Sequence, residues 1–73
     1  MPKLYSAKQV IKALQKAGFV KISQKGSHIK LRGLREGRLL TVIVPNHKVI
    51  AKGTLTSILR QADATKIEFE SYL

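Results

Sequence analysis

The segment SHIKLRG at residues 27–33 restricts the fold of this chain more than any other feature. Its apolar residues Ile29 and Leu31 are expected on one face of a β-strand, because successive side chains of a strand point to opposite faces. The other face would carry three polar side chains, His28, Lys30 and Arg32. This alternation is typical of an antiparallel sheet that is covered on one face and open to solvent on the other.

Two further segments have the residue types of short strands. Residues 19–24 lead into a turn at Lys25 and Gly26, and residues 38–44 are rich in β-branched side chains and end at a proline. Residues 34–37, with the sequence LREG, are expected to form the turn between the second and third strands. Three short strands joined by tight turns predict an antiparallel meander.

An amphipathic helix is predicted before these strands. Ser6 followed by Gln9 forms a capping-box pattern, and Gly18 is suited to end the helix because glycine adopts the left-handed conformation readily. The apolar face of this helix would consist of Ala7, Val10, Ile11, Leu14 and Ala17. The opposite face would carry a ridge of lysines, Lys8, Lys12 and Lys16.

Two helices are predicted after the strands and a loop at residues 45–53. Thr54 is expected to cap a helix with the inner residues Leu55, Ile58, Leu59 and Ala62. Thr65 and Glu68 form a second capping-box pattern at the start of a short last helix, which contains Ile67, Phe69, Tyr72 and Leu73. The order α-β-β-β-α-α predicts a single α+β domain over residues 1–73, with helices packed on one face of a three-stranded antiparallel sheet.

The chain has a net charge of +10, and this charge is unevenly distributed. Residues 1–62 contain thirteen Lys or Arg and one acid, Glu36, whereas residues 63–73 contain three acids and one lysine. A strongly basic segment of this kind attracts polyanions. The charge therefore favours a nucleic-acid-binding surface over a basic surface that is only hydrated. No apolar run approaches the roughly 20 residues of a membrane span, so we expect a cytoplasmic protein without a membrane partner.

Several chemistries lack the residues that they need. The chain has no cysteine, and its two histidines and four acids offer no credible metal cluster. It contains no P-loop, dinucleotide-binding fingerprint or GxSxG motif, so no cofactor and no metal are expected. Aromatic stacking platforms for bases are not expected either, because the second and third predicted strands contain no aromatic residue.

His28 is the candidate catalytic residue. On a strand it would be spaced by about 7 Å from Lys30, and Arg32 would follow at the same spacing, which suits one phosphodiester and its neighbours. Positive neighbours favour the neutral imidazole that a general base requires, and they would also hold the phosphate. Gly26 lets the backbone approach a ligand closely, and Ser27 adds a hydroxyl donor. From spacing alone, an ordinary exposed histidine fits the same pattern.

His47 lies in the predicted loop and has two interpretations. It is either a second proton-transfer group or a structural hydrogen-bonding residue, and the second role is the more common one for a loop histidine.

Four elements of the sequence together resemble the HicA toxin family. They are AGF at residues 17–19, KGSHIKL at 25–31, VPNH at 44–47 and KGTLTSILRQA at 52–62. Their order and spacing cover nearly the whole chain. The GSH element combined with the downstream GTL-x-x-IL helix is specific, whereas either one alone is a weak signal.

The resemblance implies both a fold and an activity. Members of this family are small ribonucleases, the messenger-RNA interferases of toxin–antitoxin systems, and their fold is similar to the double-stranded RNA-binding domain. The family's essential histidine lies in the GSH motif and corresponds to His28, while His47 matches a recurrent position of open role. A HicB-type antitoxin that covers the active site is the implied partner. Asp63 departs from the pattern, because many members have a glycine there.

The resulting hypothesis is a metal-independent endoribonuclease that acts on mRNA. His28 would take the proton from a ribose 2′-hydroxyl, and Lys30 and Arg32 would stabilise the charge on the attacked phosphate. Lys25, Gly26 and Ser27 are further candidates for phosphate binding. One alternative is a non-catalytic RNA-binding module, and another is a docking face for an acidic protein.

Overall fold

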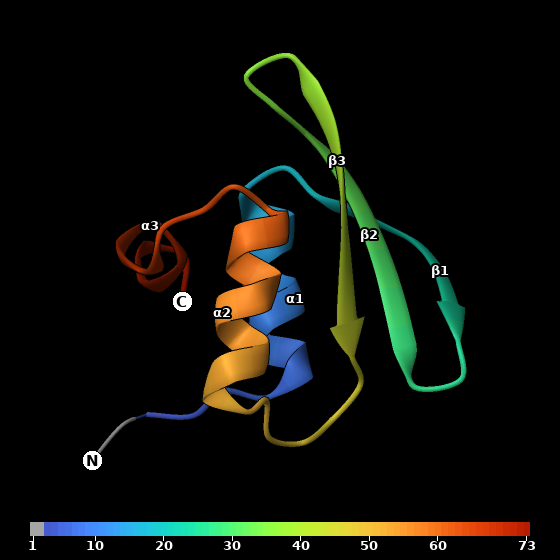
Figure 1. Cartoon of the computed structure of the whole chain (residues 1–73), viewed down its shortest axis with the longest axis vertical. Coiled ribbons are helices and arrows are strands. Elements are labelled where there is room, and N and C mark those ends of the chain that lie inside the picture. The colour runs from blue at the N-terminus through green and yellow to red at the C-terminus, as the bar shows by residue number, and fades with distance from the viewer. Residues whose placement is uncertain (1–2) are drawn as a thin grey trace.

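The computed structural model describes residues 3–73 and confirms the predicted order of elements. Residues 1 and 2, which the predicted domain includes, lie outside the described residues. The elements are α1 (Ala7–Lys16), β1 (Val20–Lys25), β2 (His28–Arg35), β3 (Arg38–Pro45), α2 (Lys52–Gln61) and α3 (Lys66–Ser71). The strands form one antiparallel sheet in the order β1-β2-β3, and the helices lie on one side of it (Figure 1). This is the expected α+β class with a three-stranded antiparallel sheet.

The ends of α1 follow the sequence signals. The Ser6 hydroxyl accepts a hydrogen bond from the Gln9 amide at 3.2 Å, and the Ser6 amide donates to the Gln9 side-chain oxygen at 2.9 Å. This reciprocal capping box satisfies amides that have no partner inside the helix. Gly18 follows the helix with φ of +105°, a conformation that side chains other than glycine adopt rarely.

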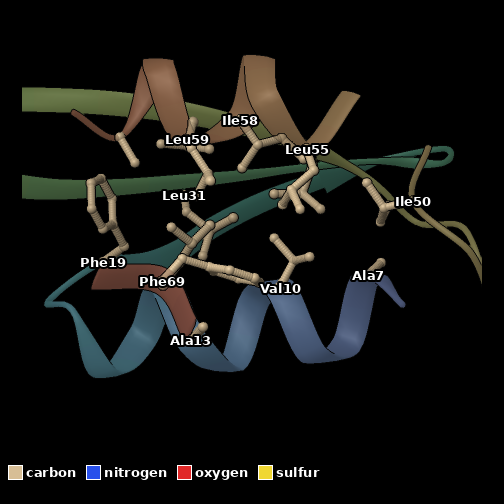
Figure 2. Close-up of a cluster of buried hydrophobic side chains, with 14 of the residues drawn as sticks. Ala7, Val10, Ala13, Phe19, Leu31, Ile50, Leu55, Ile58, Leu59 and Phe69 are labelled. Carbon is tan, nitrogen blue, oxygen red and sulfur yellow. The ribbon is translucent and has the colours of Figure 1, made fainter. Parts of the chain in front are cut away.

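The core lies between the helices and the inner face of the sheet (Figure 2). Leu31, from the central strand, is fully buried among side chains of α1, α2 and α3. Farther along β2, Gly33 continues the inward face, and a Cβ placed there would come within 2.8 Å of the Phe19 ring. The strand therefore passes too close to Phe19 to accommodate a side chain at residue 33.

The turn between β2 and β3 is shorter than predicted. Residues 34–37 were expected to form it, but β2 continues to Arg35 and only Glu36 and Gly37 connect the strands, with φ of +51° and +80°. Two positive φ angles are the mark of a two-residue hairpin turn whose twist matches that of the flanking strands. As a result Leu34 belongs to the sheet and pairs with Leu39. The third strand likewise extends one residue farther than predicted, to Pro45 opposite His28.

The predicted cap of α2 is wrong, whereas Thr65 caps α3 as predicted but without the reciprocal bond of a capping box. α2 begins at Lys52, with Ala51 at the N-cap and no side-chain cap, so Thr54 lies within the first turn. The chain is instead fixed by a bridge to the N-terminal segment, in which the Ile50 amide donates to the Tyr5 carbonyl at 2.7 Å. At α3, the Thr65 hydroxyl accepts from the Glu68 amide at 3.0 Å. The carboxylate of Glu68 does not return to Thr65, because it binds an arginine of the sheet.

The acidic C-terminal segment is attached to the β2–β3 hairpin. Arg35 binds Glu68 through two parallel hydrogen bonds of 2.7 Å and also donates to the Asp63 carbonyl at 3.1 Å. Arg38 lies 3.3 Å from the Asp63 carboxylate. The hydrogen bonds to Arg35 lower the pKa of Glu68, and the same bonds raise the pKa of Arg35. The ion pairs of Arg35 and Arg38 neutralise charge at the end of the molecule that contains the β2–β3 turn, which we call the hairpin end.

Replacing Glu68 by Gln is expected to lower the free energy of unfolding by about 1–2 kcal/mol at pH 7, because a charge-assisted pair is lost. The pKa of Glu68 is lower in the folded state than its unfolded value of about 4.3. The contribution of the carboxylate is therefore fully present above that value and disappears as the pH falls through the folded pKa. Urea unfolding at pH 7 and at pH 3 should show the difference between wild type and variant shrinking in acid.

The control for this variant is Glu70→Gln, which removes an exposed acid from the same helix. Its effect should stay within about 0.5 kcal/mol, as is usual for surface changes. Equal stabilities of the Glu68→Gln and Glu70→Gln proteins at pH 7 would show that the contact with Arg35 contributes nothing.

Candidate nucleic-acid interface

The uncovered face of the sheet carries the polar side chains predicted from the alternation in β2. Ile29 and Leu31 are buried, whereas His28 and Arg32 are exposed and Lys30 is half-buried. The outward row starts at the first residue of β2, so His28 lies at the end of the sheet that contains the β1–β2 turn (Figure 1). We call this end of the uncovered face the histidine end.

Strand register determines the neighbours of His28 on this face. Lys25 of β1 and Pro45 of β3 lie directly opposite it on either side. Side chains of directly opposed residues share a face of the sheet, with Cβ atoms about 4.5–5.5 Å apart. The exposed side chains of Lys25 and His28 therefore start from neighbouring positions on this face. Lys30 lies between Ser23 and Ile43 in the same way, which accounts for its partial burial.

The turn before His28 exposes its backbone and side chains. Gly26 has φ of +58°, which the tight connection requires, and a Cβ at this position would meet no other atom within 4 Å. Ser27 is exposed as well. Lys25, Gly26 and Ser27 therefore lie beside His28 at the same end of the sheet.

Arg32 is held across the strands. Its Nε donates to the Thr41 hydroxyl at 3.3 Å, and Thr41 is its directly opposed partner on β3. This bond uses one of the five N–H donors of the guanidinium. The side chain is thereby oriented along the uncovered face while donors remain for an anion.

The cross-strand neighbours of His28, Lys30 and Arg32 include no acid. The four acids of the chain lie elsewhere, with Glu36 at the hairpin turn and Asp63, Glu68 and Glu70 in the C-terminal segment. Within residues 3–73, no group of three or more His, Cys, Asp or Glu is arranged to hold a metal ion. Because its outward row is basic and has no acidic cross-strand neighbour, this face suits an anion rather than a cation.

No helix in the described part of the chain is long and apolar enough to cross a membrane.

His47 lies beside the histidine end but not on the uncovered face. The Asn46 amide donates to the Ser27 carbonyl at 2.6 Å, and the His47 carbonyl accepts from the Ala7 amide at 3.0 Å. These bonds join the loop after β3 to the β1–β2 turn and to the start of α1. His47 lines an open cleft together with Ser6, Lys8, Asn46 and Lys48.

The hairpin end of the uncovered face is apolar, which the sequence analysis missed. Leu34 and Leu39 are directly opposed and are 66% and 62% exposed, and Val20, opposite Arg32, is 62% exposed. The turn predicted at LREG places Leu34 outside the sheet. The alternation of β2 in fact continues through Leu34, and a Glu-Gly pair fits a two-residue connection. The uncovered face therefore has a basic and an apolar end.

These features define a class of protein, a small α+β domain whose uncovered sheet face is cationic around one exposed histidine. The family model of the HicA toxin of bacterial toxin–antitoxin matches residues 7–64, from α1 to just beyond α2. The chain therefore belongs to the HicA toxin family, and its resemblance to that family is confirmed. Membership implies a toxin–antitoxin pairing. A search for matching curated proteins found none. The last helix, α3, lies beyond the matched residues.

Proposed function

We propose that this toxin is a metal-independent endoribonuclease that cleaves mRNA in the cytoplasm, with His28 as the general base. The proposal is carried by one observation. His28 is exposed at the end of β2, directly opposite Lys25, on a face where no cross-strand neighbour of the outward cationic row is acidic. An imidazole beside several cations is suited to accept a proton from a group on a bound polyanion.

The reaction is a transphosphorylation within the RNA, in which the phosphoryl group moves from a 5′-oxygen to a 2′-oxygen. The imidazole of His28 removes the proton of a ribose 2′-hydroxyl, and the 2′-oxygen forms a bond to the adjacent phosphorus. The bond from phosphorus to the 5′-oxygen of the next nucleotide breaks, and that oxygen takes up a proton from water. The imidazolium of His28 returns its proton to the solvent, so no net proton is gained or lost. The products are a 2′,3′-cyclic phosphate and a 5′-hydroxyl, so atoms balance without a metal or a cofactor.

Three cations would stabilise the charge that builds on the phosphate during attack. Lys25 is next to His28 across the strands, and Lys30 and Arg32 follow on the same face of β2. Preorganised donors aimed at developing charge are among the strongest contributions to catalysis. Gly26 and Ser27 would add a close backbone approach and a hydroxyl donor beside the same phosphate.

A HicB-type antitoxin is the partner that we propose for this face. The support is membership of a toxin–antitoxin family together with the composition of the surface. An inhibitor with acidic side chains would pair with the basic end, and its apolar side chains would cover Leu34 and Leu39, which are largely exposed here. Binding in this position would block access of RNA to His28.

The same surface also fits a non-catalytic RNA-binding module. Lys25 and the cations of β2 would bind phosphates on this face without any role for the imidazole in chemistry. The two functions differ in their products, because only the enzyme yields shortened RNA with new ends.

Incubation of the purified protein with end-labelled RNA in excess chelator separates these functions. We expect cleavage to persist without metal and to give fragments that end in a 2′,3′-cyclic phosphate and begin with a 5′-hydroxyl. Loss of cleavage in chelator, or a 5′-phosphate on the new fragments, would contradict the mechanism. Binding that weakens steeply with salt and leaves the RNA intact would identify the binding module instead.

A further inference from the structure

We propose that the cleft lined by Ser6, Lys8, Asn46, His47 and Lys48 binds a second backbone phosphate of the RNA, adjacent to the one attacked at His28. The chemical class of the ligand is a phosphodiester of a single RNA strand. This inference rests on the proposed function, because it takes RNA to be the ligand of the neighbouring site. The binding that it predicts is nevertheless measured independently of cleavage.

The cleft is linked to the histidine end through the loop that follows β3. Pro45 is directly opposite His28, and the next residue, Asn46, is hydrogen-bonded through its amide to the Ser27 carbonyl at 2.6 Å. His47 then contacts the start of α1 through its carbonyl, which accepts from the Ala7 amide at 3.0 Å. Figure 1 shows the β1–β2 turn, the end of β3 and the starts of α1 and α2 at the same end of the molecule. An RNA strand that leaves His28 past Ser27 therefore reaches this cleft.

The lining of the cleft matches an anion. It includes two lysines and one histidine and no carboxylate. Lysines are flexible point charges that suit a phosphate contact without sequence preference. The lining contains no Phe, Tyr or Trp on which a base could stack, which favours the backbone of the RNA over a nucleobase.

The position of Lys8 in the lining of the cleft is unfavourable for the stability of α1. Lys8 lies in the first turn of α1, where the helix dipole is positive, and no acidic residue is present in that turn. Lys52, which does not line the cleft, begins α2 at the same end of the molecule, again without an acid in the first turn. By contrast, Lys16 lies in the last turn of α1 and donates to the Tyr72 carbonyl at 3.1 Å. Cations that oppose the dipole at one end of the molecule are explained by a bound anion there.

The test combines two variants with a chemically altered RNA. Binding of a single-stranded RNA oligonucleotide is measured in the His28→Ala protein, alone and with the added pair Lys8→Gln and Lys48→Gln. The control is Lys12→Gln, which removes a lysine of the same helix that does not line the cleft. Each phosphate of the oligonucleotide is replaced in turn by a neutral methylphosphonate.

Loss of one contacted phosphate should reduce the salt slope by about 0.7, which corresponds to about fivefold weaker binding at 0.1 M salt. We expect this loss for the Lys8/Lys48 pair and not for Lys12→Gln. One methylphosphonate position should produce the same loss in the His28→Ala protein and no further loss once both lysines are replaced. Because Lys8→Gln removes a cation from a helix N-terminus, the melting temperature should not fall.

Binding by the Lys8/Lys48 variant that equals the Lys12→Gln control would overturn the second phosphate site. The proposal would also be overturned if the loss of affinity from the lysine substitutions multiplied the loss from the methylphosphonate at every position. The lysines and the phosphates would then act independently. Cleavage is scored separately with His28 intact. An absence of cleavage there would reject the endoribonuclease and leave the binding result for the cleft unchanged.

Discussion

The His28→Ala protein should cleave RNA about 10²–10⁴-fold more slowly than wild type while binding it almost as well, since removal of a general base has effects of this size. In the proposed function the binding energy would come from the neighbouring cations, which the substitution leaves in place. His28 is exposed and takes no part in the core, so the fold should also be unaffected. Gel assays of cleavage and filter-binding assays of affinity, made on the same preparations, measure the two quantities.

Two controls make this prediction specific to proton transfer. An RNA with 2′-deoxyribose at the scissile position should resist wild-type protein, because the attacking oxygen is missing. Controlled expression of wild type and of His28→Ala should then differ in growth arrest and in the integrity of cellular RNA. Unchanged cleavage by the His28→Ala protein would end the catalytic assignment. Parallel losses of cleavage and binding would point to a binding role for the imidazole.

The Leu31→Ala protein should be less stable than wild type by about 2–5 kcal/mol, the range found for large-to-small changes in a well-packed core. Leu31 has no exposed surface, and it lies on the central strand, where it meets side chains of all three helices. A domain of this size has little stability to spare, so the variant should be partly unfolded at room temperature. Urea denaturation followed by circular dichroism measures the difference.

Leu34→Ala is the matched control, because it makes the same change three residues later on the same strand. Leu34 is 66% exposed and faces away from the core, so its loss should be within about 0.5 kcal/mol. If Leu31→Ala were as mild as Leu34→Ala, the burial of the inner face of β2 would be wrong. The comparison therefore tests the alternation from which both the core and the candidate site are derived.

Local patterns predicted the elements whose causes are local. The capping box of Ser6 and Gln9, the burial of Ile29 and Leu31, and the inner face of α2 all depend on neighbours within one turn or one strand, and they were confirmed. The errors have longer-range causes. α2 begins before Thr54, at a position fixed by the bridge from Ile50 to Tyr5. The carboxylate of Glu68 binds Arg35 of the sheet instead of the backbone at the start of α3.

The candidate site shows the same division. The row of His28, Lys30 and Arg32 follows from the period of a strand. The placement of Lys25 beside His28 depends on the register between strands, which the spacing within β2 does not contain. The contact of the His47 carbonyl with the start of α1 joins segments that are far apart in the chain. Pairings of this kind are decided by the packed fold, so a single sequence does not specify them.

The contact of Arg35 and Arg38 with Glu68 and Asp63 has an effect on how a polyanion first meets the protein. It leaves the hairpin end nearly charge-balanced, while the opposite end keeps its cations. The long-range field is therefore asymmetric along the molecule, and it would orient an approaching negatively charged strand before any contact forms. Encounters would be biased toward the imidazole, and this bias would weaken as added salt shortens the reach of the field.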